Sequence, residues 1–91
     1  FNPILEAAPS DVRNKIKQIE QIAPTGDFKK LKELAHSLIG ISSSLFATRL
    51  LQLAQQIEIS ADNHEMDNAS INQLNNVGEE TITWWHSFIQ K

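Results

Sequence analysis

The sequence contains no cysteine, and this absence removes several classes of site at once. Cysteine-ligated zinc fingers, iron-sulfur clusters, disulfide frameworks and thiol nucleophiles all need the missing side chain. The chain also lacks a glycine-rich phosphate loop, paired histidines at metal-ligand spacing and a serine in a strand-to-helix elbow. Metal-free, cofactor-free chemistry is what remains.

Basic charge is also scarce. Eleven acidic and eight basic residues give a net charge of -3, and no basic stripe alternates with aromatic residues. Nucleic acid is therefore not an expected partner. No apolar run approaches the roughly 20 residues needed to cross a bilayer, so direct membrane contact is not expected either. The 91 residues suit one domain, residues 1–91, which we expect to be monomeric in isolation.

Three polar breaks divide the chain, at residues 23–27, 40–44 and 60–65. Between them apolar residues recur with the period of a helix, and no segment shows a convincing period of two. The first helix is expected to run to Ala23. It should kink or break near Pro9, because proline removes one backbone hydrogen bond and crowds the previous turn, while Ser10 could equally cap a new helix.

Three further amphipathic helices are predicted. Their expected starts are an N-cap at Thr25 or Asp27, a point between Ser42 and Ser44, and a point near Asp67 or Ser70. The third helix is expected to end before Asp62. The expected buried stripes are Phe28, Leu31, Leu34, Ala35, Leu38, Ile41 and Leu45, then Phe46, Ala47, Leu50, Leu53, Ala54 and Ile57, then Ile71, Leu74, Val77, Thr81, Trp85 and Phe88. Short connections favour an all-α, antiparallel up-down four-helix bundle.

His36 stands out because it lies about 150° from the centre of the second helix's apolar stripe, where burial does not explain it. Lys29, Lys32, Gly40 and Ser43 are its neighbours on that exposed face. Glycine inside a helix costs about 0.5–1 kcal/mol relative to alanine, so Gly40 requires either a functional reason or a helix end nearby. A missing side chain beside an exposed imidazole would let another protein approach the ring. The other histidines, His64 and His86, are expected to be ordinary solvated surface.

The segment from Leu34 to Glu58, LAHSLIGISSSLFATRLLQLAQQIE, resembles the histidine-containing phosphotransfer (HPt) domain of multistep phosphorelays. The family core reads approximately A-H-x-L-K-G-x-S-x-x-x-G-A-x-x-L-x-x-x-x-x-x-L-E. Residues in or conservatively near those places are Ala35, His36, Leu38, Gly40, Ser42, Ala47, Leu50, Ile57 and Glu58. The resemblance implies that His36 accepts a phosphoryl group from an aspartate of one response-regulator receiver domain and passes it to another receiver.

The same resemblance implies supporting roles. Lys29 and Lys32 would partly offset the charge of the phosphoryl group, and Glu58 would orient the ring by accepting from its distal N–H. The competing interpretation of Glu58 is a solvated carboxylate at a helix end. The expected partner-binding residues are Ile39, Gly40 and Ser43. No cofactor is expected on this chain, since the receiver brings the Mg²⁺.

The chain departs from the family pattern at two positions. Ile39 replaces the usual lysine and lies at the core edge or on the docking surface, and Phe46 replaces a glycine and is expected to add core volume. The first change is the best support for an alternative function, a non-catalytic helical module that uses the surface around Ile39 and Gly40. A small hydrolase with His36 as base lacks a nucleophile and a pocket.

An HPt domain is not a kinase, so no self-contained enzymatic activity is expected. The start at Phe1 and the end just after the last helix favour the C-terminal piece of a hybrid sensor histidine kinase. The domain would then be cytoplasmic, with its parent anchored in the bacterial inner membrane.

Overall fold

The computed structural model describes the backbone of residues 3–45 and 47–89 and the side chains of residues 10–45 and 47–87. Within these ranges the chain forms four α-helices, one short 3-10 helix and no strand. The elements are α1 (Pro3–Ile22), η1 (Ala23–Thr25), α2 (Phe28–Ser44), α3 (Thr48–Asp62) and α4 (Asn68–Ile89). The all-α class predicted from the sequence is confirmed.

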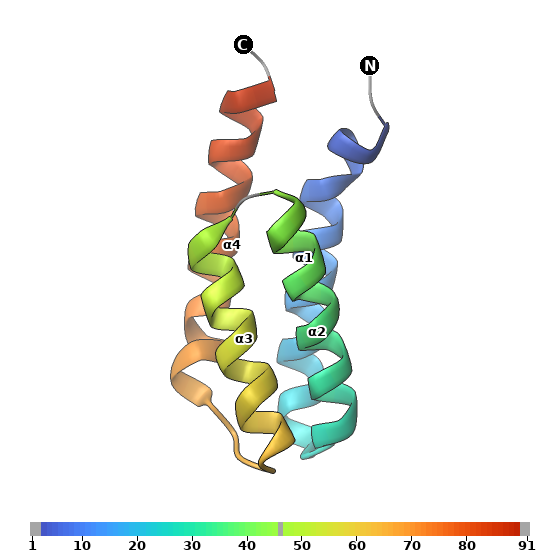
Figure 1. Ribbon diagram of the computed structural model, residues 1–91, viewed down its shortest axis with the longest axis vertical. Coiled ribbons are helices and arrows are strands. Elements are labelled where there is room, and N and C mark those ends of the chain that lie inside the picture. The colour runs from blue at the N-terminus through green and yellow to red at the C-terminus, as the bar shows by residue number, and fades with distance from the viewer. Residues whose placement is uncertain (1–2, 46, 90–91) are drawn as a thin grey trace.

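The helices form an antiparallel bundle in which α2 and α3 make a hairpin (Figure 1). Each helix packs on two neighbours, in the order α1, α2, α3, α4 and back to α1. The first residues of α1 and the last residues of α4 lie at the same end of the bundle. Because α2 and α3 run in opposite directions, residues early in α2 face residues late in α3.

Local capping fixes where α2 and α4 begin. The Asp27 carboxylate accepts a hydrogen bond from the backbone amide three residues later, at 3.1 Å. Gly26 precedes it with φ of 75°, a left-handed conformation that glycine adopts without steric cost. Asp67 accepts from the amide of Ser70 at 3.0 Å in the same way. Of the predicted alternatives, the caps are thus Asp27 rather than Thr25, and Asp67.

Several helix boundaries differ from the prediction. α1 ends at Ile22 and not at Ala23, which begins η1. α1 continues through Pro9 as one helix, so the predicted break is wrong, while the kink stays a prediction. α2 runs on to Ser44 and α3 begins only at Thr48, so the predicted start between Ser42 and Ser44 is also wrong. The Ser44 hydroxyl donates to the Gly40 carbonyl at 3.0 Å, so this side chain is satisfied within α2 and does not cap α3.

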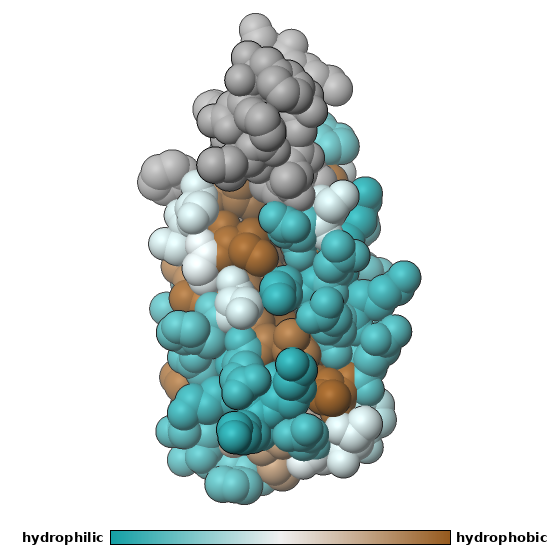
Figure 2. Space-filling model, turned by 90° about the vertical axis from the view of Figure 1, so that its right-hand side faces the viewer, coloured by the Kyte–Doolittle hydropathy of each residue, from teal (hydrophilic) through white to brown (hydrophobic). Residues whose placement is uncertain are grey.

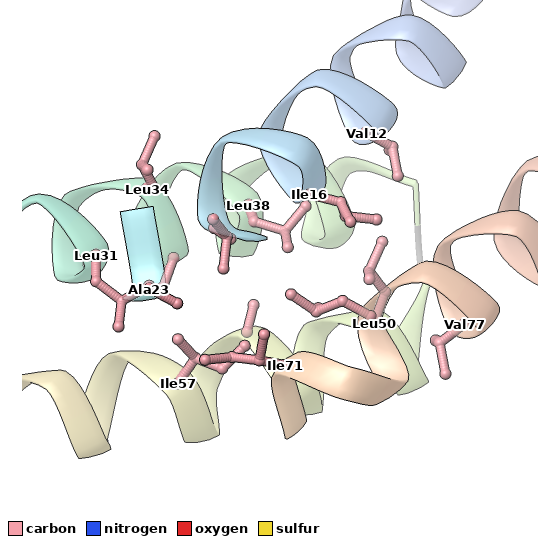
Figure 3. Packing of buried hydrophobic residues seen from close by; sticks show 14 of the residues in the cluster. Val12, Ile16, Ala23, Leu31, Leu34, Leu38, Leu50, Ile57, Ile71 and Val77 are labelled. Carbon is pink, nitrogen blue, oxygen red and sulfur yellow. The ribbon is translucent and has the colours of Figure 1, made fainter. Parts of the chain in front are cut away.

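The core consists of the helix faces that the hydrophobic period predicts (Figure 3). Its largest fully buried apolar residues are Val12, Ile19, Leu31, Leu38, Leu50, Ile57 and Leu74. Members of the predicted stripes that are only half-buried are Phe28, Ile41, Ala47, Leu53 and Thr81. Ile82 is buried where Thr81 was expected, and α3 includes Asp62, before which it was expected to end. Phe46 and the Phe88 side chain lie outside the described residues. Polar side chains dominate the surface in Figure 2, with apolar patches between them.

Two glycines inside helices have opposite surroundings and give a matched pair of variants. A methyl group at Gly40 would meet nothing within 4 Å, whereas one at Gly78 would collide with Cδ1 of Ile16 across the α1–α4 contact. We expect Gly40→Ala to raise the free energy of unfolding by about 0.5–1 kcal/mol, because alanine is the better helix former. Gly78→Ala should gain less than this or lose stability, because Ile16 must move. Urea unfolding measures both, and equal gains would contradict the packing described for Gly78.

Candidate functional site

His36 lies at the middle of α2 and points away from the core. Its side chain is 77% exposed, while Leu38, two residues later on the same helix, is fully buried. This alternation follows from helical geometry, because the apolar residues of α2 lie on the face opposite His36. The predicted exposure of the imidazole is therefore confirmed.

Glu58 of α3 reaches across the hairpin to the imidazole. Its Oε2 lies 2.7 Å from Nδ1 of His36, and the Glu58 side chain is only 25% exposed. A carboxylate only accepts hydrogen bonds, so the contact requires Nδ1 to carry the hydrogen and to donate it. Nδ1 is the ring nitrogen nearer the backbone, so the expectation of a contact through the distal nitrogen is wrong. The lone pair of the neutral ring is then on Nε2.

A second pair crosses the same hairpin one turn away. Lys32 donates to Oδ1 of Asp62 at 2.6 Å. This hydrogen bond and the attraction between the two charges raise the pKa of the Lys32 ammonium and lower the pKa of the Asp62 carboxyl. Lys32 was expected beside the phosphate, and its pairing with Asp62 was not expected. The available signal was the spacing, since Lys32 and His36 are four residues apart on α2, as Glu58 and Asp62 are on α3.

The imidazole opens onto a shallow depression in the surface. Its lining residues are Lys29, Lys32, Glu33, His36 and Glu58. Lys29 is exposed there and has no hydrogen bond or ion pair within the described part of the chain. The depression therefore holds two ammonium groups beside the ring, of which one is already paired, and two carboxylates. Glu33 was not singled out from the sequence.

The three predicted partner-binding residues follow His36 along α2. Gly40 and Ser43 are exposed, and by helical spacing they share the face of the imidazole. Ile39 is half-buried and packs against the core, so it lies at the boundary between core and surface. With no side chain at Gly40, a flat approach to the ring from this side is sterically open.

The other two histidines have different settings. His64 follows α3 with φ of 57°, and its exposed ring meets the edge of Phe28 at a centroid distance of 5.5 Å. His86 is exposed in the last turn of α4. Among the residues whose side chains are described, neither has an acidic hydrogen-bond partner, as His36 has in Glu58. Within residues 10–45 and 47–87, no three His, Asp or Glu side chains are grouped so that they could hold a metal ion.

Among the described helices, none is both long and apolar enough to span a membrane.

Together the fold and the site define an antiparallel four-helix bundle that presents one acid-paired histidine in the middle of its second helix. The family model of the Hpt domain matches residues 4–83, and the chain belongs to this family. Its function is accordingly phosphotransfer in two-component signalling, with receiver domains of response regulators as partners. Searches of curated proteins and of solved structures gave no match.

Proposed function

We propose that this Hpt domain carries a phosphoryl group on Nε2 of His36, taking it from an aspartate of one receiver domain and giving it to an aspartate of another. The observation that carries the proposal is the 2.7 Å contact between Nδ1 of the exposed imidazole and Glu58. This contact supports a hydrogen on Nδ1, donated to the carboxylate, and a lone pair on Nε2 of the exposed ring that can act as the nucleophile.

The proposed step is a single displacement at phosphorus. The Nε2 lone pair attacks the phosphorus of the aspartyl phosphate, and the N–P bond forms as the bond from phosphorus to the carboxyl oxygen breaks. That oxygen leaves with the electron pair as part of a carboxylate. The ring keeps its Nδ1 hydrogen and becomes positively charged, and the carboxylate of Glu58 offsets that charge. Transfer to the second receiver is the same step in reverse.

For this step the chain mainly has to orient the imidazole of His36. Phosphoryl transfer is catalysed mostly by positioning and by offsetting charge. The half-buried Glu58 fixes the ring, and the exposed Lys29 supplies a cation beside it. In this proposal the Mg²⁺ belongs to the receiver. The domain would work in a cytoplasmic phosphorelay with a hybrid sensor kinase as its parent, a part of the proposal that rests on the family alone.

Incubation with a receiver charged by acetyl phosphate tests the proposal. The chain should acquire phosphate that is labile in acid and stable in base, as expected of phosphohistidine. A chain that binds the charged receiver and acquires no phosphate would overturn the proposal. That result would favour the non-catalytic interaction module, whose support is Ile39 in place of the family's lysine.

Ile39→Lys separates docking from chemistry. We propose that the exposed part of Ile39 contacts the receiver, where burying apolar area contributes about 1.5 kcal/mol or more for a fully buried side chain. A lysine one turn from the ring adds a cation whose exposed contact with phosphate is worth about 1 kcal/mol. The substitution should therefore raise the Kd for the receiver while preserving or raising the single-turnover rate of transfer.

The half-burial of Ile39 sets the control for that experiment. Because its inner side packs on the core, the stability of the Ile39→Lys variant is measured first, by thermal unfolding. Global unfolding of the variant would show that core packing dominates at this position. A folded variant with unchanged Kd and unchanged rate would show that Ile39 is a tolerated edge and not part of the docking surface.

A further inference from the structure

Lys32 lies where it could bind either of two anions. It lines the same depression as His36, one helical turn before it on α2. In the unphosphorylated chain its ammonium donates to Asp62 at 2.6 Å, and it is also close enough to Glu58 for the two charges to attract each other. Lys32 therefore belongs both to the pair with Asp62 and to the lining of the depression at the imidazole.

The pair with Lys32 explains why a carboxylate stands at position 62. Asp62 is the last residue of α3, where the helix dipole presents its negative end, so a carboxylate at this place is unfavourable for the helix itself. Its side chain is 63% exposed, so it does not contribute to the core. The ammonium of Lys32 offsets this unfavourable placement.

A phosphoryl group on Nε2 would change the balance of charge in the depression. It would bring close to two negative charges next to Glu33 and Glu58, which already line the same space. The family's lysine at position 39 is replaced by isoleucine, so that position supplies no cation. Lys29 and Lys32 are the cations that line the depression, and of these Lys32 is the one held by a carboxylate.

On the basis of the proposed function, we propose that Asp62 is a positioning residue that binds Lys32 while His36 is unphosphorylated. When His36 is phosphorylated, Lys32 moves from Asp62 to the phosphoryl group. One exposed ion pair replaces another, since the two side chains are 48% and 63% exposed. The two ion pairs differ little in free energy, so phosphoryl transfer to and from His36 stays readily reversible. This free-energy difference corresponds to about a two- to fivefold change in the phosphotransfer equilibrium.

The exchange can be observed without any receiver. Potassium phosphoramidate phosphorylates exposed imidazoles directly, and His64→Asn with His86→Gln leaves His36 as the target. At a mildly alkaline pH, where phosphohistidine persists, carbon-detected NMR then follows the Asp62 carboxyl carbon, whose chemical shift responds to the hydrogen bond from Lys32. We expect this carbon to shift on phosphorylation toward its value in a Lys32→Ala chain, because the hydrogen bond from Lys32 is lost.

The same measurement in the Lys32→Ala chain is the control. There the Asp62 carboxyl carbon should change little on phosphorylation, since its hydrogen bond to Lys32 is already absent. An unchanged Asp62 carbon in the chain with Lys32 would overturn the exchange. A change of equal size in both chains would also overturn it, because it would reflect a direct effect of the phosphoryl group.

A second test measures the equilibrium with a receiver. Asp62→Asn should shift phosphate toward this chain by about two- to fivefold, and in the Lys32→Ala background it should cause no shift. Glu79→Gln is the matched control, because it breaks the exposed Arg13–Glu79 pair between α1 and α4 and removes the same charge. An equal shift from Asp62→Asn in both backgrounds would overturn the proposal. If the native chain takes no phosphate from any receiver, the proposed function fails, and the Asp62 carbon shift after chemical phosphorylation still decides the exchange.

Discussion

His36→Gln is expected to abolish phosphate uptake from a charged receiver, lowering the rate by several orders of magnitude, as removal of a nucleophile does. The side chain is 77% exposed, and within the described part of the chain its hydrogen-bond partner is Glu58, so the fold does not depend on it. Glutamine can still donate to the Glu58 carboxylate through its amide. The free energy of unfolding should therefore change by no more than about 0.5 kcal/mol.

The measurement compares radiolabel on the variant with radiolabel on the native chain, and far-UV circular dichroism verifies that helicity is retained. His64→Asn and His86→Gln are the matched controls, and both should keep full uptake. Retained labelling of a folded His36→Gln chain would show that the phosphoacceptor lies elsewhere. Loss of helicity in that variant would contradict the placement of the imidazole on the surface.

Leu38→Ala is expected to cost the most stability, about 3–4 kcal/mol of the free energy of unfolding. Leu38 is fully buried between the helices, two residues after the exposed imidazole. The substitution loses the transfer free energy of the removed atoms and leaves a cavity that the neighbouring helices fill only in part. A domain of this size has a total stability of about 5–14 kcal/mol, so the loss takes a large share of it.

Urea unfolding measures the effect, with Ser37→Ala as the control. Ser37 is exposed on the same turn of α2 and should change stability by less than about 0.5 kcal/mol. At a temperature where the Leu38→Ala chain is still folded, its phosphate uptake should persist, since the imidazole and Glu58 are untouched. A loss below about 1 kcal/mol would show that this part of the core is loosely packed.

The sequence predicted faces of helices better than their ends or their mutual register. Hydrophobic period alone placed Leu38 inside and His36 outside, because both positions follow from one rotation per residue. The end of α2 was misplaced because a Gly and Ser segment is typical of a break. In the bundle the hydroxyl of Ser44 donates to the Gly40 carbonyl within α2 and does not cap a new helix.

The pairing across the α2–α3 hairpin was only partly accessible. The family pattern brought Glu58 to the ring, but the carboxylate contacts Nδ1 and not the distal nitrogen that was expected. The Lys32–Asp62 pair depends on how far α3 slides along α2, and the period of one helix carries no information on that distance. Once the His36–Glu58 contact is known, equal spacing of four residues on both helices leads to the second pair.

The nitrogen that carries the phosphate tests the central claim most directly. After uptake from a receiver, proton-detected nitrogen and phosphorus NMR of the imidazole distinguishes phosphate on Nε2 from phosphate on Nδ1. The contact between Nδ1 and Glu58 predicts that the phosphoryl group is on Nε2 of His36, with a hydrogen still on Nδ1 facing the carboxylate. Phosphate on Nδ1, or on His64 or His86, would contradict the account.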